Sequence, residues 1–339
     1  MKMSLPSRLF LVCFLVFALS VSVESQKPPS FADPGEKGPY EIGFTSFLIM
    51  DSSRNTDIGG RPIPVYFWYP VDPSDINAVT PEAIYPLDPL NSVVPPTSSS
   101  DWEAYGFDKA YQEPPVSTDG PFPLLLFSPG WGGPAWGHLN VGTRLASHGI
   151  AVAVTYHWGD GFWPWEPLDH LAVASMNRPL DISFMLTHLL AMNGTPGELI
   201  FNSINPNHVA ASGWSLGGYA AMALAGGDDS VCDKFPSLGF PNPPPETCVP
   251  ALPDPRISAI VTLDGSTQLL YFNELARIDV PTMGIGQEWS TLDMLSGEEF
   301  ASLQARLHAA SQGHPCYRVD LAEAYHHTFS NHCEAASLL

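Results

Sequence analysis

The segment His208–Gly226, HVAASGWSLGGYAAMALAG, joins a short apolar run, a Gly-x-Ser-x-Gly pentapeptide and an alanine-rich stretch. The apolar run is typical of a buried strand and the alanine-rich stretch of a helix, so the pentapeptide falls on a strand-to-helix turn. Ser215 is its central residue, between Gly213 and Gly217. Glycines suit the crowded positions beside an exposed serine, and a helix N-terminus favours nearby negative charge. We therefore expect Ser215 to be a nucleophile rather than a bystander in a glycine-rich turn.

Short apolar runs alternate with helical spacing on both sides of this turn. The expected strands are residues 63–71, 122–130, 150–158, 257–265 and 280–287, followed by a last strand with its loop over 316–329. Helices are expected over 138–149, 178–192 and 297–311. Pro179 falls near the start of the second of these helices, where proline is tolerated. Such alternation is typical of βαβ units. We predict an α/β-hydrolase fold, with a mostly parallel central sheet and helices on both faces.

The N-terminal residues 1–25 have the pattern of a secretory signal peptide. Basic residues precede an apolar run of about thirteen residues, which is shorter than the ~20 that a spanning helix requires. A membrane anchor is the less favoured alternative. We expect a secreted, extracellular protein with a single domain over 26–339, in which 70–120 and 228–256 are surface excursions.

Charge and cysteine content exclude several classes of partner. The chain has 14 Lys and Arg against 35 Asp and Glu, a formal net charge of −21. This disfavours nucleic acid and an electrostatic attraction to anionic lipid.

After the signal peptide four cysteines remain, and we favour the disulfides Cys232–Cys248 and Cys316–Cys333. No CxxC or HExxH spacing supports a zinc site, and we expect no cofactor.

A serine hydroxyl needs a base to take its proton, and in α/β-hydrolases the chain order is Ser, Asp or Glu, then His. The base should therefore lie late, after the last strand. The stretch AYHHTFSNHC offers His326, His327 and His332, whereas His314 precedes that strand. From position alone, the adjacent pair His326 and His327 stays open.

An acidic residue must orient the histidine and stabilise its cation. Asp264 directly follows the strand AIVTL, at a carboxyl end where such sites are built. Glu288 and Asp293 follow the next strand and are the alternatives. We favour Asp264, with Glu288 second.

An oxyanion hole needs two backbone N–H groups directed at the developing charge. One is expected from Leu216, directly after the nucleophile. The other is expected from Trp131, in the loop FSPGWGG, whose glycines permit close approach of the backbone. For substrate binding we select Trp214 together with Trp158 and Trp163 of an aromatic loop, which would form an apolar mouth.

These residues together resemble the secreted, plasma-type platelet-activating factor acetylhydrolases, which are lipoprotein-associated phospholipases A2 of the α/β-hydrolase fold. The resemblance runs from about 122 to 329, interrupted by 228–256. PLLLFSPGWGG is similar to the strand and oxyanion loop of that family, although Pro129 stands where a histidine is usual, and GWSLGG replaces G-H-S-F-G-G. LDG matches the place of the family's aspartate and HHTFSN its H-x-x-F-[AS]-[DN] ending, which implies Asp264 and His326.

Bacterial polyester hydrolases, cutinase-like lipases and dienelactone-hydrolase relatives share these features more loosely. The polyester enzymes usually place their aspartate after the fifth strand, where this chain has Ser290. The resemblance implies a serine carboxylic-ester hydrolase that acts through an acyl-enzyme on short-chain or platelet-activating factor-like phospholipid esters. Its partner would be a small-molecule or lipid ester, with transient contact with a lipid surface.

Two alternatives remain. One is a carboxylesterase, lipase or polyesterase of broader scope. The other is a non-catalytic hydrolase-fold binding protein, which the presence of candidates for all three members of the triad disfavours.

Overall fold

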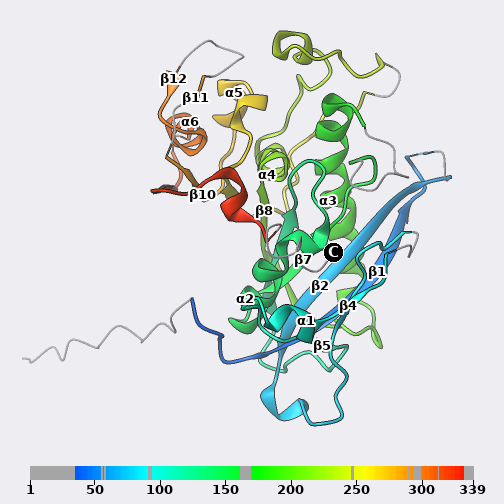
Figure 1. The fold of residues 1–339 in the computed structure, drawn as a ribbon. Coiled ribbons are helices and arrows are strands. Elements are labelled where there is room, and N and C mark those ends of the chain that lie inside the picture. The colour runs from blue at the N-terminus through cyan, green and yellow to red at the C-terminus, as the bar shows by residue number, and fades with distance from the viewer. Residues whose placement is uncertain are drawn as a thin grey trace, which may run out of the picture. The chain divides into compact units, whose positions relative to one another are not determined.

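The computed structural model describes residues 35–54, 56, 59–90, 94–160, 169–245, 248–288, 291–292, 299–311 and 313–331. In this part of the chain, the centre is a nine-stranded sheet of order β13-β10-β9-β8-β6-β7-β2-β1-β5 (Figure 1). Its strands are β1 Glu41–Asp51, β2 Arg61–Val71, β5 Tyr111–Gln112, β6 Phe122–Ser128, β7 Ala151–Thr155, β8 Ile204–Trp214, β9 Ala259–Leu263, β10 Thr282–Gln287 and β13 Cys316–Leu321.

The run of strands from β7 to β13 is parallel throughout, and β2 joins it antiparallel through β7. Parallel neighbours need crossover connections, and helices supply them here. The α-helices are α1 Ser99–Glu103, α2 Leu139–Ser147, α3 Leu171–Asn193, α4 Leu216–Gly226, α5 Phe272–Leu275 and α6 Leu303–Ala310. The predicted α/β-hydrolase fold is therefore confirmed.

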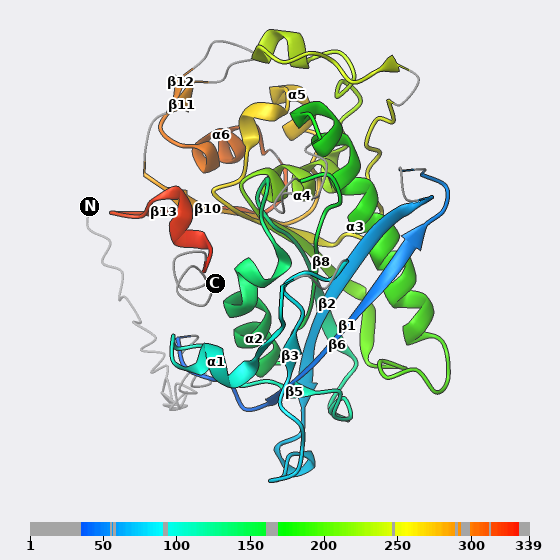
Figure 2. The same ribbon diagram turned by 45° about the vertical axis from the view of Figure 1, so that its right-hand side comes forward.

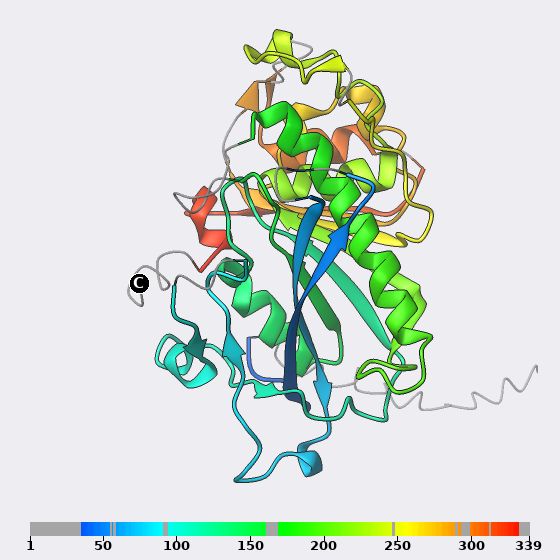
Figure 3. The ribbon, with the colours of Figure 1, turned by 90° about the vertical axis from the view of Figure 1, so that its right-hand side faces the viewer.

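Alternation along the strands divides the core into two layers. In β2, Val65 and Phe67 pack in the cluster that contains α3, α4 and α6, whereas Tyr66 and Trp68 pack in the cluster that contains α2. Figures 2 and 3 show α3 along one face of the sheet and α2 on the other. Helices cover both faces, so β2 has no polar face and every residue in it is buried.

Short elements occupy the connections. The 3-10 helices are η1 Pro73–Asp75, η2 Ala135–His138, η3 Phe235–Leu238, η5 Thr267–Leu269 and η6 His326–Phe329, and the small strands are β3 Ile84–Tyr85, β4 Thr97–Ser98, β11 Thr291–Leu292 and β12 Glu299–Phe300. The segment between β2 and β6 contains β3, β4 and α1, and it buries Tyr85 and Trp102.

Two of the expected helix boundaries are wrong. The helix α3 begins at Leu171, seven residues before the expected start at 178, so Pro179 lies inside it rather than near its first turn. The helix expected from 297 begins at Leu303, because the Ser302 side chain accepts the Ala305 amide and caps it. Residues 299–300 instead form β12, which pairs with β11.

The predicted Cys232–Cys248 disulfide is confirmed, with 5.9 Å between the Cα atoms. It closes the connection between α4 and β9. Beside it, the fully buried Lys234 forms ion pairs with Asp228 and, at 3.5 Å, with Glu274. Cys333 lies outside the described residues, so the pairing with Cys316 stays a prediction. In the described part of the chain, no helix is long and apolar enough to cross a membrane.

Candidate active site

Ser215 lies between β8 and α4 in a strained backbone conformation. Its φ of 55° and ψ of −118° are rare for a residue with a side chain. The neighbouring backbone approaches so closely that a Cβ on Gly217 would lie 1.9 Å from the Ser128 carbonyl oxygen, and one on Gly213 would lie 2.3 Å from the Gly217 carbonyl carbon. Both glycines are therefore required by space, and the tight turn leaves Ser215 half-buried rather than enclosed.

Asp264 and His326 come together from distant parts of the chain. Asp264 follows β9 and is fully buried, and its Oδ2 lies 2.5 Å from Nδ1 of His326, at the start of η6. The imidazole is 37% exposed. A buried carboxylate on Nδ1 fixes the imidazole orientation and leaves Nε2 to exchange a proton, which is the arrangement a general base requires.

The other candidates are placed differently. Glu288 is exposed beyond the end of β10, and His327 is exposed beside His326. Both ring nitrogens of His314 are buried without a hydrogen-bond partner among the described residues. Asp293, Ser290 and His332 lie outside the described residues. The structure thus brings Asp264 to His326 and not to any other histidine that it describes.

Trp214 connects the strand before Ser215 to the histidine. Its Nε1 donates a hydrogen bond of 2.8 Å to the main-chain oxygen of His326, and the two rings lie 4.9 Å apart between centroids. Trp214 is only 4% exposed, and a Cβ on Gly130 would lie 2.6 Å from its ring. It therefore packs beneath His326 and against the loop after β6. Trp158 is also buried, and Trp163 lies outside the described residues.

Ser215 itself is connected to the Asp264–His326 pair through main-chain contacts. Its N–H donates to the carbonyl oxygen of Leu263, the residue before Asp264, at 3.0 Å, and its carbonyl oxygen accepts from Ser266 at 2.9 Å. Among the described residues the Ser215 hydroxyl makes no hydrogen bond with His326. Such a contact is often long without substrate and tightens in the Michaelis complex.

Gln287 is a member of this site that the sequence did not suggest. Its Nε2 donates to Oδ2 of Asp264 at 2.9 Å, and its main-chain oxygen accepts from Nε2 of Gln304 at 3.1 Å. A second donor on the same carboxylate oxygen holds its position relative to His326. The available signal was the location of Gln287 at the carboxyl end of β10, where parallel strands gather functional side chains.

The loop after β6 carries the Trp131 amide that was predicted as an oxyanion donor. Gly133 donates its N–H to the Gly130 oxygen at 2.9 Å. The Trp131 amide has no partner within the part of the chain that the structure describes. Leu216 is the first residue of α4, so its N–H has no acceptor within the helix. Both predicted donors are therefore available to a ligand.

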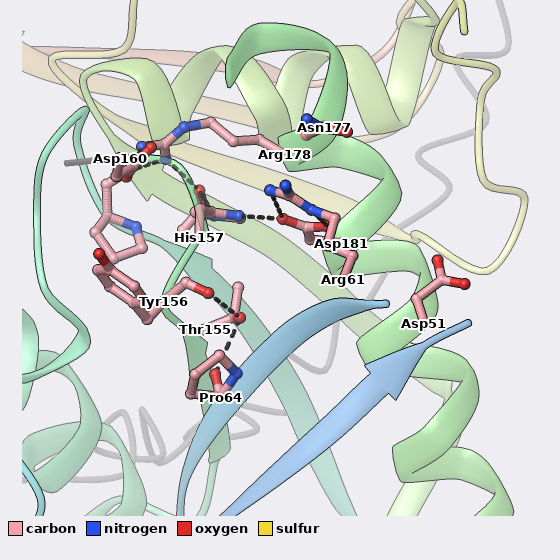
Figure 4. A network of polar contacts seen from close by, with 12 residues as sticks. Asp51, Arg61, Pro64, Thr155, Tyr156, His157, Asp160, Asn177, Arg178 and Asp181 are labelled. Atoms are coloured by element: carbon pink, nitrogen blue, oxygen red, sulfur yellow. Dashed lines mark hydrogen bonds and ion pairs between the residues drawn. The ribbon is translucent and has the colours of Figure 1, made fainter. Parts of the chain in front are cut away.

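A second Ser–His–Asp array, made of Ser128, His157 and Asp181, is buried in the interior; Figure 4 shows its His157 and Asp181. His157 contacts the Ser128 hydroxyl through Nε2 and the Asp181 carboxylate through Nδ1, each at 2.9 Å. All three side chains are inaccessible, and the Ser128 hydroxyl also accepts from Arg178 at 3.1 Å. No substrate can reach this serine, so the array is structural.

Burial strongly shifts the pKa values of His157 and Asp160 in this interior. Burial, reinforced by the charge of Arg178, lowers the pKa of His157 to about 3, so the ring is neutral. Its Nδ1 then donates to Asp181 and its Nε2 accepts from Ser128. Burial raises the pKa of Asp160 to about 6, opposed by the charge of Arg178. In the described part of the chain, no group of three or more His, Cys, Asp or Glu side chains is placed to hold a metal ion.

The fold is that of the α/β-hydrolases. Among solved structures, a ferulic acid esterase from Streptomyces cinnamoneus is similar, with a TM-score of 0.53 and 19% sequence identity, over 88% of this chain and 78% of that chain. A scan against family models and a search of curated proteins gave no match. At this identity the likeness establishes a shared fold, so the activity must be argued from the site.

Proposed function

We propose that this protein is a secreted serine carboxylic-ester hydrolase with Ser215 as nucleophile, His326 as base and Asp264 as the orienting acid. The observation that carries the proposal is the 2.5 Å contact between buried Asp264 and His326, next to a serine in a strained and accessible turn. Strain at such a turn is a common feature of functional sites, and a carboxylate–imidazole pair is the partner that a serine nucleophile needs.

The reaction is a two-step acyl transfer. His326 takes the proton of Ser215 as its hydroxyl attacks the ester carbonyl, and the amides of Trp131 and Leu216 stabilise the tetrahedral oxyanion. His326 then protonates the departing alcohol, which leaves an acyl group on Ser215. A water molecule, deprotonated by His326, hydrolyses this acyl-enzyme and restores the serine. Asp264 holds the imidazole tautomer and stabilises the imidazolium in both steps.

The substrate class we favour is a short-chain ester, including platelet-activating factor-like phospholipid esters, as the sequence resemblance implies. An ester of an aromatic acid is the second candidate, supported by the similar structure of a ferulic acid esterase. The 43% exposed Trp131 indole, beside the proposed oxyanion donor, offers such a ring a stacking surface. Trp214, Trp158 and Trp163 remain predicted substrate contacts, with Trp214 and Trp158 acting from beneath the surface.

The test compares Ser215→Ala with Ser212→Ala, a matched change three residues earlier, on β8. Hydrolysis of nitrophenyl acetate should disappear in Ser215→Ala and persist in Ser212→Ala, and an organophosphonate should label only the peptide that contains Ser215. Retained turnover by folded Ser215→Ala would overturn the proposal. Complete inactivity of the natural chain, with no labelling, would favour the non-catalytic binding protein.

The same enzyme preparation separates the substrate classes. Rates should be compared on nitrophenyl acetate, an acetyl phospholipid, methyl ferulate and a long-chain triglyceride. A preference for the acetyl phospholipid supports the acetylhydrolase-like substrate, and a preference for methyl ferulate supports the aromatic ester. Comparable rates on all four indicate a carboxylesterase of broader scope.

A further inference from the structure

Arg178 is a fully buried cation whose contacts converge on the loop after β6. It comes from α3, and its guanidinium donates to the carbonyl oxygens of Pro129 at 2.6 Å and Gly130 at 3.0 Å. A third bond, of 3.1 Å, reaches the hydroxyl of Ser128. Main-chain carbonyls in a loop normally face water, so three bonds from one buried side chain to consecutive residues indicate a specific role.

The guanidinium is itself held in place from two sides. On one side, Asp160 forms an ion pair of 2.5 Å with Arg178. On the other side, Ser128 is held by His157, which is held by Asp181. Asp181 is anchored by the Arg61 fork, with bonds of 2.7 and 2.8 Å (Figure 4).

The consequence for the site follows from peptide geometry. The Gly130 carbonyl and the Trp131 N–H belong to the same peptide unit, which is planar and trans, so they point in opposite directions. A bond from Arg178 to the Gly130 oxygen therefore fixes the direction of the Trp131 N–H, away from the guanidinium. A positive charge on the carbonyl oxygen also polarises the peptide and strengthens its N–H as a donor.

We propose that Arg178 is a positioning residue that aims and polarises the Trp131 amide, and that Asp160 and the Ser128–His157–Asp181 array hold Arg178 for this purpose. The proposal rests on the proposed esterase function and adds to it a role for residues that touch neither substrate nor Ser215. It also explains why a Ser–His–Asp array is kept in the interior. With the ring neutral, Ser128 donates to His157 and keeps a lone pair for Arg178.

The test replaces Arg178 with Met, which keeps an unbranched apolar chain and removes the donors. We expect kcat for nitrophenyl acetate to fall by about 10² or more, as when an oxyanion donor is lost, with KM little changed. The affinity for an alkyl boronic acid, whose tetrahedral adduct with Ser215 places an oxygen in the oxyanion hole, should weaken by a similar factor. A structural role alone would lower the melting temperature and leave both quantities, per folded molecule, unchanged.

Lys234→Met is the matched control, because Lys234 is also a fully buried, ion-paired cation and makes no bond to the loop after β6. It should lose thermal stability yet keep kcat and boronic acid affinity when assayed well below its melting temperature. If Arg178→Met does not fold, Arg178→Lys and Asp160→Asn test the proposal instead. Each keeps a polar side chain and disturbs the contacts between Arg178 and the loop after β6. Each should lower kcat and boronic acid affinity together.

The proposal is overturned if a folded Arg178 or Asp160 variant matches the natural chain in kcat and boronic acid affinity. Ser215→Ala, measured alongside, separates this failure from failure of the proposed function. Unchanged positioning variants with an inactive Ser215→Ala would reject only the role of Arg178. Persistent turnover by Ser215→Ala would reject the esterase mechanism itself.

Discussion

The indole N–H of Trp214 holds the main-chain oxygen of His326 at 2.8 Å, so the residue before the proposed nucleophile positions the proposed base. The two residues are 112 positions apart in the chain, and β8 and η6 meet through this contact. The Trp214 ring also fills the space left by the missing Cβ of Gly130. One side chain therefore connects the strand-to-helix turn at Ser215, the 3-10 helix η6 and the loop after β6.

Trp214→Phe should reduce turnover without abolishing it. The variant keeps an aromatic ring beneath His326 and removes one hydrogen bond, worth about 1 kcal/mol, and a small displacement of the base can cost up to about 10² in rate. We expect kcat to fall about tenfold or more and KM to change little, measured by steady-state kinetics on nitrophenyl esters. Unchanged kcat in the folded variant would show that the contact does not position His326.

Asp264→Asn should abolish most of the activity, whereas Glu288→Gln should leave it intact. The amide has the shape of the carboxylate but neither stabilises an imidazolium nor selects the required tautomer, an effect of about 10⁴ in serine hydrolases with this arrangement. Glu288 is exposed and serves as the control from the neighbouring strand end. The opposite result, with Glu288→Gln inactive, would transfer the acid role to the strand β10 side of the site.

His326→Ala and His327→Ala separate two adjacent candidates for the base. Only His326 contacts the Asp264 carboxylate, so its removal should lower kcat by at least about 10³, while His327→Ala should keep kcat within about tenfold. Rates should be measured by steady-state kinetics on nitrophenyl acetate. Comparable losses in both variants would contradict a single catalytic histidine.

The buried His157 should make the protein sensitive to acid. Burial holds the pKa of the folded state at about 3 against 6.5 for an ordinary histidine, so below about pH 6.5 the unfolded chain binds a proton that the native chain does not. The contribution of His157 to the free energy of unfolding is therefore fully present above about pH 6.5 and is lost as the pH falls towards 3. Each pH unit within this window removes up to about 1.4 kcal/mol.

Asp181 adds to this loss at lower pH. Its burial alone would raise the pKa, but the charge of Arg61 and the bonds from His157 and Arg61 hold the pKa well below the usual range. Its contribution is present above about pH 4 and is lost as the carboxylate is protonated.

Urea unfolding at pH 7 and pH 5 tests the role of His157. The free energy of unfolding should decrease less between these pH values in His157→Gln than in the natural chain. Equal decreases would rule out His157 as the acid-sensitive group.

The local sequence determined the central features of this protein. Neighbouring residues alone specify a strand in the apolar run, a turn at Gly213-x-Ser215-x-Gly217 and a helix in the alanine-rich stretch. The strand-to-helix turn at Ser215 was therefore predictable. Strand–helix alternation predicted the parallel sheet for the same reason. The Cys232–Cys248 disulfide was also predictable, because its loop is short and closes within one connection.

Only the tertiary structure decided which distant side chains meet. Asp264 and His326 are 62 positions apart, and the structure places Asp264 against His326 while Glu288 lies exposed beyond the end of β10. The tolerance of proline near a helix start favoured a start at 178, yet α3 begins at Leu171 and places Arg178 in the interior. Contacts of this kind depend on how elements pack, and packing is a sum over many non-local surfaces that no single stretch of sequence contains.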